Sequence, residues 1–219
     1  MNSLKKITSF IHREGWKFSF ISLIFSIFLS YIYIPVSLLG FCITFFIIWF
    51  FRDPERVSPN IPNTLVSSAD GEICLIDEAA PPEELGLSDI KMQRICIFMN
   101  VFNVHVNRSP VNGTVKKIAY KEGSFFNASF DKASEKNERN SLIIETQDRV
   151  QIVVVQIAGL IARRILSFID PGKHLTEGER FGLIRFGSRV DIYMPQNAKI
   201  ESKLGDKVVA GETIIAYLK

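Results

Sequence analysis

The sequence is poor in cysteine, in histidine and in net charge. It has three cysteines, three histidines and a formal net charge of +3 over 219 residues. An odd number of cysteines without a CxxC pair argues against a disulfide framework, favours a reducing compartment and predicts no metal site. The small positive charge gives no reason to expect nucleic acid as a partner, although it is compatible with an anionic membrane surface.

Charge is absent altogether from one long stretch, Phe18–Phe51. A spanning helix needs about 20 apolar residues, so these thirty-four residues are too many for one span and slightly few for two. Pro35 divides the stretch. This pattern predicts an N-terminal membrane helical hairpin that turns near Tyr33–Ser37 and is either spanning or re-entrant. A cleaved signal peptide is the alternative, but Trp49–Arg52 offers no small-residue cleavage site.

Basic residues flank the uncharged stretch on both sides, and a tryptophan marks each edge. Lysine and arginine next to membrane segments favour the cytoplasmic side. We therefore expect both ends of the hairpin, and the domain that follows it, on the cytoplasmic side of the cell inner membrane. The residues are Lys5, Lys6, Arg13, Lys17, Arg52 and Arg56, with Trp16 and Trp49 at the edges.

The remaining chain predicts a proline-rich linker at residues 52–66 and one domain at residues 67–219, after an anchor at residues 1–51. Short β-branched runs bounded by glycine turns indicate a mostly β domain, a sandwich or barrel with few helices. The predicted strands are 71–76, 95–99, 113–118, 141–145 and 150–157; the predicted helix is 158–169; the predicted polar loops are 81–89 and 130–140.

The C-terminal segment 203–217 is similar to the half-motif of lipoyl and biotinyl domains, in which a Gly-Asp turn and a later glycine shape a flattened β-sandwich. This similarity favours a lipoyl-like architecture. It also supports an alternative function, a membrane-anchored adaptor or carrier domain without catalysis. A carrier is disfavoured because no lysine occupies the tip of an obvious hairpin between two such motifs.

Two polar positions stand out as candidates for chemistry. His105 follows a strand-like run and precedes a Pro-Gly turn, so it is either a structural or a catalytic histidine. Asp70 precedes Gly71 in what is usually a simple turn. His12 lies in the basic flank and His174 in a loop, and neither is expected to act chemically.

A third candidate, the dipeptide Gly187-Ser188, lies in a β-rich segment, residues 180–195, which resembles the self-cleavage segment of short-form phosphatidylserine decarboxylase proenzymes. Residues 126–140 and the motifs around Asp70 and His105 also resemble that family, so the resemblance covers nearly the whole chain. It implies that Ser188 attacks the carbonyl of Gly187, a step that needs a proton acceptor and an oxyanion donor.

The resemblance implies that self-cleavage between 187 and 188 gives a large and a small chain, which remain associated as a heterodimer. Ser188 would become a covalent pyruvoyl group, the only cofactor. That group would decarboxylate phosphatidylserine to phosphatidylethanolamine through a Schiff base. His105 would position the carboxylate and supply a proton, and Asp70 would orient the base or assist self-cleavage.

The sequence departs from the longer members of that family at two points. They have Leu-Gly-Ser-Thr at the cleavage site and a second histidine in the middle motif, whereas this chain has Phe-Gly-Ser-Arg and Arg108. The residue that assists self-cleavage is therefore left open. A pyruvoyl enzyme acting on a soluble amino acid is a further alternative, which the hairpin disfavours because a soluble substrate needs no anchor.

Overall fold

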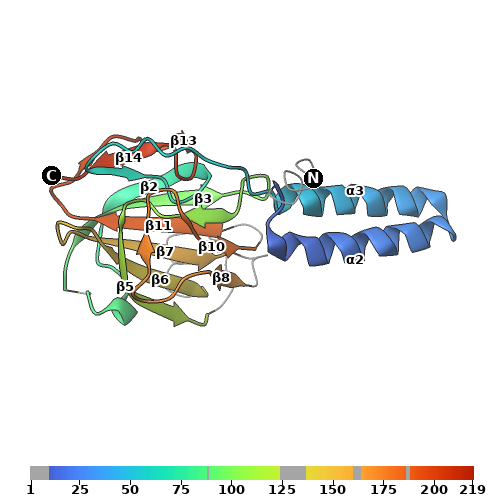
Figure 1. Ribbon diagram of the computed structural model, residues 1–219, viewed down its shortest axis with the longest axis horizontal. Helices are drawn as coiled ribbons and strands as arrows, with labels where there is room; N and C mark the ends of the chain where they lie inside the picture. The colour runs from blue at the N-terminus through green and yellow to red at the C-terminus, as the bar shows by residue number, and fades with distance from the viewer. Residues whose placement is uncertain (1–9, 88, 124–136, 160–163, 186–187) are drawn as a thin grey trace. The chain divides into compact units, whose positions relative to one another are not determined.

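A computed structural model describes residues 10–87, 89–123, 137–159, 164–185 and 188–219. The chain divides into two compact units, one ending at Glu55 and the other running from Arg56 to Lys219. The first unit is helical and the second is mostly β (Figure 1).

The first unit is a helical hairpin, as predicted from the uncharged stretch. Its helices are α2 (Arg13–Ser30) and α3 (Ile34–Phe50). The turn lies at residues 31–33, slightly earlier than predicted, because Pro35 belongs to the first turn of α3. A proline is tolerated there, since its missing N–H would have no helical partner.

Hydroxyl groups and a glycine line the contact between α2 and α3. Thr44 Oγ1 lies 2.8 Å from Ser22 Oγ and 3.3 Å from Ser26 Oγ. A Cβ atom at Gly40 would come within 2.6 Å of Ser26 Oγ, so the glycine allows this close approach. The large side chains face outward; Phe25, for example, is 60% exposed.

None of the helices in the described ranges combines the length and the apolar composition that crossing a bilayer requires.

In the part of the second unit that the structure describes, one eight-stranded antiparallel sheet has the order β13-β2-β3-β11-β7-β6-β5-β9, and two three-stranded sheets have the orders β1-β14-β12 and β4-β10-β8. The large sheet curls, so that its strands enclose a core (Figure 1). The strands are β1 (Thr64–Val66), β2 (Gly71–Ala79), β3 (Met92–Met99), β4 (Val106–Arg108), β5 (Gly113–Lys121), β6 (Arg139–Glu145), β7 (Gln151–Ala158), β8 (Ile165–Ser167), β9 (His174–Leu175), β10 (Arg180–Ile184), β11 (Ser188–Met194), β12 (Lys199–Ile200), β13 (Lys207–Val208) and β14 (Ile214–Tyr217).

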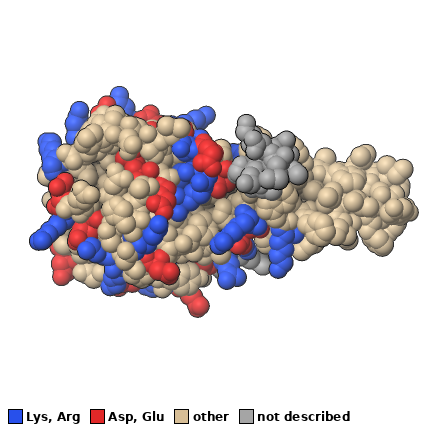
Figure 2. Space-filling view, in the orientation of Figure 1, with Lys and Arg blue, Asp and Glu red and all other residues tan. Residues whose placement is uncertain are grey.

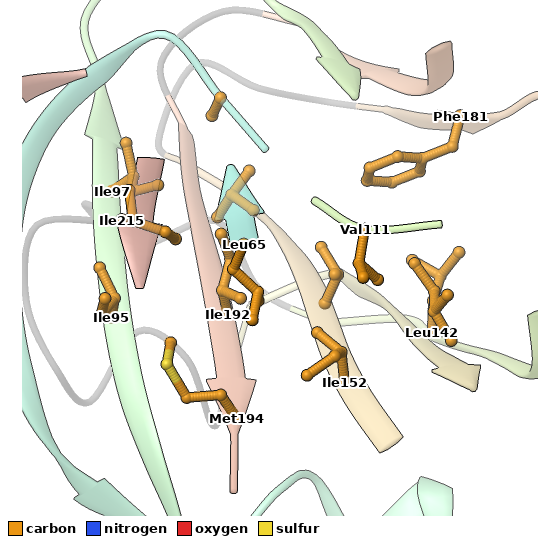
Figure 3. Close-up of a cluster of buried hydrophobic side chains, with 14 of the residues drawn as sticks. Leu65, Ile95, Ile97, Val111, Leu142, Ile152, Phe181, Ile192, Met194 and Ile215 are labelled. Atoms are coloured by element: carbon orange, nitrogen blue, oxygen red, sulfur yellow. The ribbon is translucent and has the colours of Figure 1, made fainter. Parts of the chain in front are cut away.

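The central strand β11 is buried along its whole length, which explains its composition. Val190, Ile192 and Met194 point to the main hydrophobic core (Figure 3), while the alternate residue Tyr193 packs in a smaller cluster on the other face. Alternate side chains of a strand point to opposite faces. A strand covered on both faces therefore needs apolar or fully paired side chains at every position.

The predicted mostly β character is confirmed, and all five predicted strands are present as β2, β3, β5, β6 and β7. The predicted helix at 158–169 is wrong where it is described, because residues 165–167 form β8 and pair with β10. The predicted loop 130–140 is also wrong at its end, because Arg139 and Asn140 begin β6. The rest of that loop up to residue 136, and residues 160–163, lie outside the described residues.

Candidate active site

Ser188 is the first residue of β11, in the middle of the large sheet. It pairs with Met99 at the end of β3 and with Ala158 at the end of β7. The side chain is fully buried, and its Oγ donates a hydrogen bond to Met99 Sδ at 3.4 Å. Gly187, the other half of the predicted cleavage site, lies outside the described residues. The serine hydroxyl is thus held by a thioether, a weak acceptor that leaves it available for reaction.

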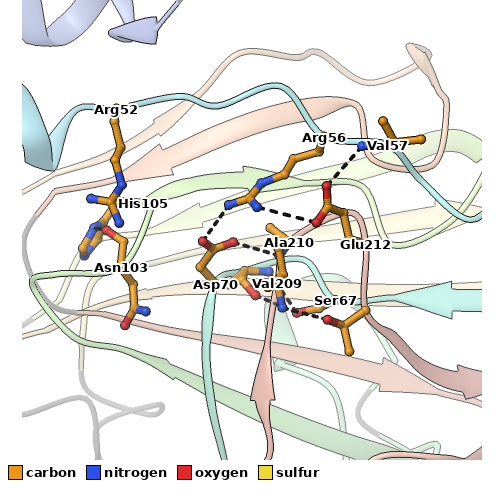
Figure 4. Close-up of polar contacts among 12 residues, drawn as sticks. Arg52, Arg56, Val57, Ser67, Asp70, Asn103, His105, Val209, Ala210 and Glu212 are labelled. Carbon is orange, nitrogen blue, oxygen red and sulfur yellow. Dashed lines mark hydrogen bonds and ion pairs between the residues drawn. The ribbon is translucent and has the colours of Figure 1, made fainter.

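His105 lies next to the strand that leads to Ser188. Its backbone carbonyl accepts a hydrogen bond from the N–H of Ile184, the last residue of β10, at 3.3 Å. His105 is 1% exposed, and Nδ1 lies 3.0 Å from the carbonyl oxygen of Asn103 (Figure 4). A carbonyl oxygen can only accept, so Nδ1 carries a proton, and in the neutral ring the lone pair is then on Nε2. This tautomer is suited to accepting a proton at Nε2.

Asp70 immediately precedes β2, and its carboxylate contacts Arg56 and Ala210 (Figure 4). Oδ2 lies 2.9 Å from a guanidinium nitrogen of Arg56, and Oδ1 accepts the backbone N–H of Ala210 at 2.8 Å. Glu212 also lies 3.6 Å from Arg56. Asp70 therefore ties the start of the domain to its C-terminal loop.

The sheet register brings Asp70, which immediately precedes β2, and Ser188, the first residue of β11, to the same end of the sheet. Phe98 of β3 pairs with both Glu72 of β2 and Arg189 of β11. The residues that precede Glu72 and Arg189 therefore lie at nearly the same position along β3. β3 separates β2 from β11, which places the two strands about 10 Å apart at the usual strand spacing.

Three other polar residues from the sequence have structural partners away from Ser188. Arg108, which occupies the place of a second histidine, donates to the carbonyl of Gly178 at 2.8 Å. His12 accepts the N–H of Glu14 and caps α2. His174, on the edge strand β9, lies 3.3 Å from Thr114 Oγ1. Within the described ranges, no group of three histidine, cysteine or acidic side chains is placed to hold a metal ion.

Sequence reasoning missed several buried polar side chains around Ser188. Asn107 donates to Met99 Sδ at 3.7 Å, the same sulfur that accepts from Ser188. Asn107 in turn accepts from Gln156, and Asn137 donates to the carbonyl of Ala158, the cross-strand partner of Ser188, at 2.7 Å. The sequence did contain one indication of these buried polar groups, because Gln156 interrupts an otherwise apolar run in β7.

The opposite face of β11 buries an ion pair. Arg189 makes two hydrogen bonds to Asp191, of 2.7 and 2.9 Å, and both side chains are almost completely buried. Burial is the largest single influence on Arg189 and lowers its pKa, but the neighbouring groups, Asp191 first among them, together hold this pKa above its ordinary value. The residue that follows Ser188 is therefore charged and fixed, which anchors the start of β11.

The fold and its buried serine can be compared with known proteins. A family model described as phosphatidylserine decarboxylase matches residues 43–216. A protein from Ruegeria pomeroyi named phosphatidylserine decarboxylase proenzyme is 50% identical over 209 residues, covering 95% of both chains. One of the same name from Azorhizobium caulinodans is 52% identical over 216 residues, covering 99% of this chain and 92% of the relative.

These matches first define the class, an enzyme of the carboxy-lyase type. More narrowly, the chain belongs to the phosphatidylserine decarboxylase family. The resemblance that the sequence motifs suggested is confirmed, and the adaptor alternative is not favoured.

Proposed function

We propose that this chain is a proenzyme that cleaves itself between Gly187 and Ser188 and then converts phosphatidylserine to phosphatidylethanolamine. The observation that carries the proposal is Ser188 itself. It begins a fully buried central strand, in a chain about half identical to proteins named phosphatidylserine decarboxylase proenzymes.

Self-cleavage requires the Ser188 hydroxyl to become a nucleophile. A bond forms between Oγ and the Gly187 carbonyl carbon, the Gly187–Ser188 C–N bond breaks, and the hydroxyl proton passes to the nitrogen. Asp70 is proposed to assist by fixing this end of the sheet through Arg56 and Ala210.

The residues around Ser188 fit a covalent pyruvoyl group derived from that serine. The position is fully buried and bordered by Asn107, whose N–H can donate to a carbonyl oxygen, and by the weakly accepting Met99. Such a group supplies a carbonyl that accepts the electrons released with carbon dioxide. His105 is proposed to hold the substrate carboxylate and to return a proton after carbon dioxide leaves.

The strand pairing supports a heterodimer after cleavage. The small chain would begin at position 188 and contain β11, β12, β13 and β14. β11 lies between β3 and β7, β13 pairs with β2, and β14 pairs with β1, so these three strands have partners in the large chain. The C-terminal turns at Gly205 and Gly211, both at positive φ, agree with a lipoyl-like arrangement of these strands.

The hairpin is proposed to insert into the bilayer from the cytoplasmic side of the inner membrane. Its outward side chains are large and apolar, while its hydroxyl groups face one another. Hydroxyl groups at a helix contact and apolar groups outside are typical of helices packed in lipid. With its hairpin in the bilayer, the enzyme would stay at the membrane surface, where the headgroups of phosphatidylserine lie.

The experiment is a turnover assay with vesicles that contain phosphatidylserine. The wild type is expected to release phosphatidylethanolamine, and Ser188→Ala is expected to form none and to remain one chain. Ser167→Ala, which changes an exposed serine of β8, is the matched control and should cleave and turn over normally. Phosphatidylethanolamine formation by Ser188→Ala would show that the proposed chemistry is wrong.

A second variant separates the two roles of the site. His105→Ala is expected to reduce decarboxylation more than self-cleavage, measured as product formed per cleaved chain. Full turnover by this variant would remove His105 from the site.

A further inference from the structure

A chain of buried amides leads through the core to Ser188. Asn140 Nδ2 donates to Gln156 Oε1 at 2.9 Å, and Gln156 Nε2 donates to Asn107 Oδ1 at 2.8 Å. Asn107 Nδ2 then donates to Met99 Sδ, which also accepts from Ser188 Oγ. All five side chains are at most 2% exposed. Buried amides are costly unless each is hydrogen-bonded, so their placement in a core of aliphatic residues needs a reason.

All the hydrogen bonds among these amides run in one direction, because each NH₂ group donates to the next residue in the order Asn140, Gln156, Asn107, Met99. Each amide has one accepting oxygen and one donating NH₂ group. Gln156 uses its oxygen toward Asn140 and its NH₂ toward Asn107, so Asn107 must turn its oxygen to Gln156 and its NH₂ to Met99. The sulfur therefore faces a donor and not an acceptor.

The backbone makes room for this chain. Asn140 and Gln156 are cross-strand partners in β6 and β7, which brings their side chains together. At Gly182 of β10, a Cβ atom would come within 2.7 Å of Gln156 Nε2. The glycine thus leaves the space that the Gln156 amide occupies.

Met99 links the amide chain to the reacting hydroxyl. A methionine side chain is flexible, and its thioether is a weak acceptor, so on its own it would hold a hydroxyl loosely. The N–H of Asn107 on the same sulfur restricts where Sδ can lie. Restricting Sδ also restricts the rotamer of Ser188, because Sδ accepts its hydroxyl.

We propose that Asn140, Gln156 and Asn107 are positioning residues for self-cleavage, which act through Met99 Sδ to hold Ser188 Oγ in its reactive rotamer. This inference rests on the proposed function, because it assigns no new reaction. It concerns the step in which the Oγ–C bond forms, the C–N bond breaks and the hydroxyl proton moves to the nitrogen.

The sharpest test is Gln156→Glu, which keeps the size of the side chain. When the new carboxyl is ionised, the direction of the hydrogen bond between residue 156 and Asn107 reverses. A carboxylate can only accept, so Asn107 must turn its NH₂ toward it and its oxygen toward Met99. When the carboxyl is protonated, its O–H donates to Asn107 and the original direction returns. Self-cleavage of this variant, relative to wild type at each pH, should therefore recover as pH falls.

The rate is measured on protein made by cell-free synthesis with phosphatidylserine vesicles, by following the appearance of the small chain on denaturing gels. A misplaced nucleophile costs about tenfold to a hundredfold in rate, so a loss of that size is expected at pH 8.5. Because burial raises the pKa of a carboxyl above its ordinary value of about 4.3, recovery is expected between pH 8.5 and pH 5.5. A loss that is the same at every pH would contradict the proposal.

Met99→Leu provides a second test that does not depend on the folding of the first variant. It keeps the volume and removes the sulfur, a change that cores tolerate well. Slower self-cleavage at all pH values is expected, with an unchanged melting temperature. Ser141→Ala is the matched control, because Ser141 neighbours Asn140 on β6 but bonds to Glu84 on the other face.

The outcomes separate this inference from the proposed function. If the wild type never cleaves, the proposed function fails. If the wild type cleaves and folded Met99→Leu cleaves equally fast, the positioning role fails while the proposed function stands.

Discussion

The hairpin and the β domain are packed in opposite ways. In the hairpin, Ser26 and Thr44 are buried between the helices, while Phe25 and Phe45 are about two-thirds exposed at 60% and 67%. In the β domain the core is aliphatic, and lysine, arginine and acidic residues cover the face shown in Figure 2, where the hairpin helices carry almost no charge. Water favours the second arrangement and lipid tolerates the first. The proposal that the hairpin lies in lipid, while the β domain lies in water, rests on this contrast.

The largest expected effect lies in the β domain, where a charged pair is buried. Asp191→Asn would remove the carboxylate that is paired with the buried charge of Arg189. We expect the free energy of unfolding to fall by about 3–5 kcal/mol, measured by urea denaturation with the protein in detergent. A change below about 1 kcal/mol would mean that water or another group can compensate Arg189.

The next effect tests the outward face of the hairpin. Phe25→Asn removes an exposed aromatic ring, and loss of its burial in lipid should cost about 1.5–3 kcal/mol, or about tenfold to a hundredfold in vesicle partitioning. Flotation with phosphatidylserine vesicles measures this. Leu204→Asn, which changes a residue of the β domain that is 67% exposed, is the control and should partition as wild type. Equal partitioning of all three proteins would show that the outer face of the hairpin does not insert into lipid.

A smaller effect tests the inward face of the same hairpin. Thr44→Val keeps the shape of the side chain and removes the hydroxyl that contacts Ser22 and Ser26. Hydrogen bonds between helices in lipid contribute on average about 0.6 kcal/mol, with a maximum near 1.7. The hairpin should therefore unfold at a lower fraction of denaturing detergent, as followed by circular dichroism of the protein in mild micelles. A more stable hairpin would show that the hydroxyl contacts are unfavourable.

The smallest effect is a pH dependence in the β domain. Burial raises the pKa of Glu84, but hydrogen bonds from Arg139, the backbone and Ser141, together with the charge of Arg139, hold this pKa below its ordinary value. The pair therefore stabilises the fold above the unfolded pKa of about 4.3, and this contribution is lost as pH falls through the lowered folded value. A partly exposed pair contributes under about 1 kcal/mol.

The matched comparison for this pair is Glu84→Gln. The difference in melting temperature between wild type and this variant should shrink as pH is lowered from 6 to 3. A difference that stays constant over that range would show that the carboxylate does not titrate in the expected direction.

Local patterns were enough to predict much of the fold. β-branched runs predicted the five strands, and an uncharged stretch interrupted by Pro35 predicted the hairpin. The segment at 165–167 was predicted as helix because its local pattern was short and ambiguous. Its pairing with β10, a contact between distant parts of the chain, decides the outcome in favour of a strand.

The polar surroundings of Ser188 could not be predicted in the same way. Met99, Asn107 and Gln156 belong to three different strands, β3, β4 and β7, which lie in two sheets, and only the packing of these sheets brings the three side chains together. Asp70 looked like an ordinary turn residue, and its partner Ala210 is 140 residues away. The roles of Ser188, His105 and Asp70 stay predictions, since they depend on chemistry that residue placement alone does not reveal.

The intact masses of the purified protein test the central claim most directly. The account predicts two chains, the larger ending at Gly187 and the smaller beginning at position 188 and lighter by one ammonia than simple hydrolysis would give. That mass difference is the signature of a pyruvoyl group made from Ser188. A single chain of 24.8 kDa that nevertheless forms phosphatidylethanolamine would contradict the account.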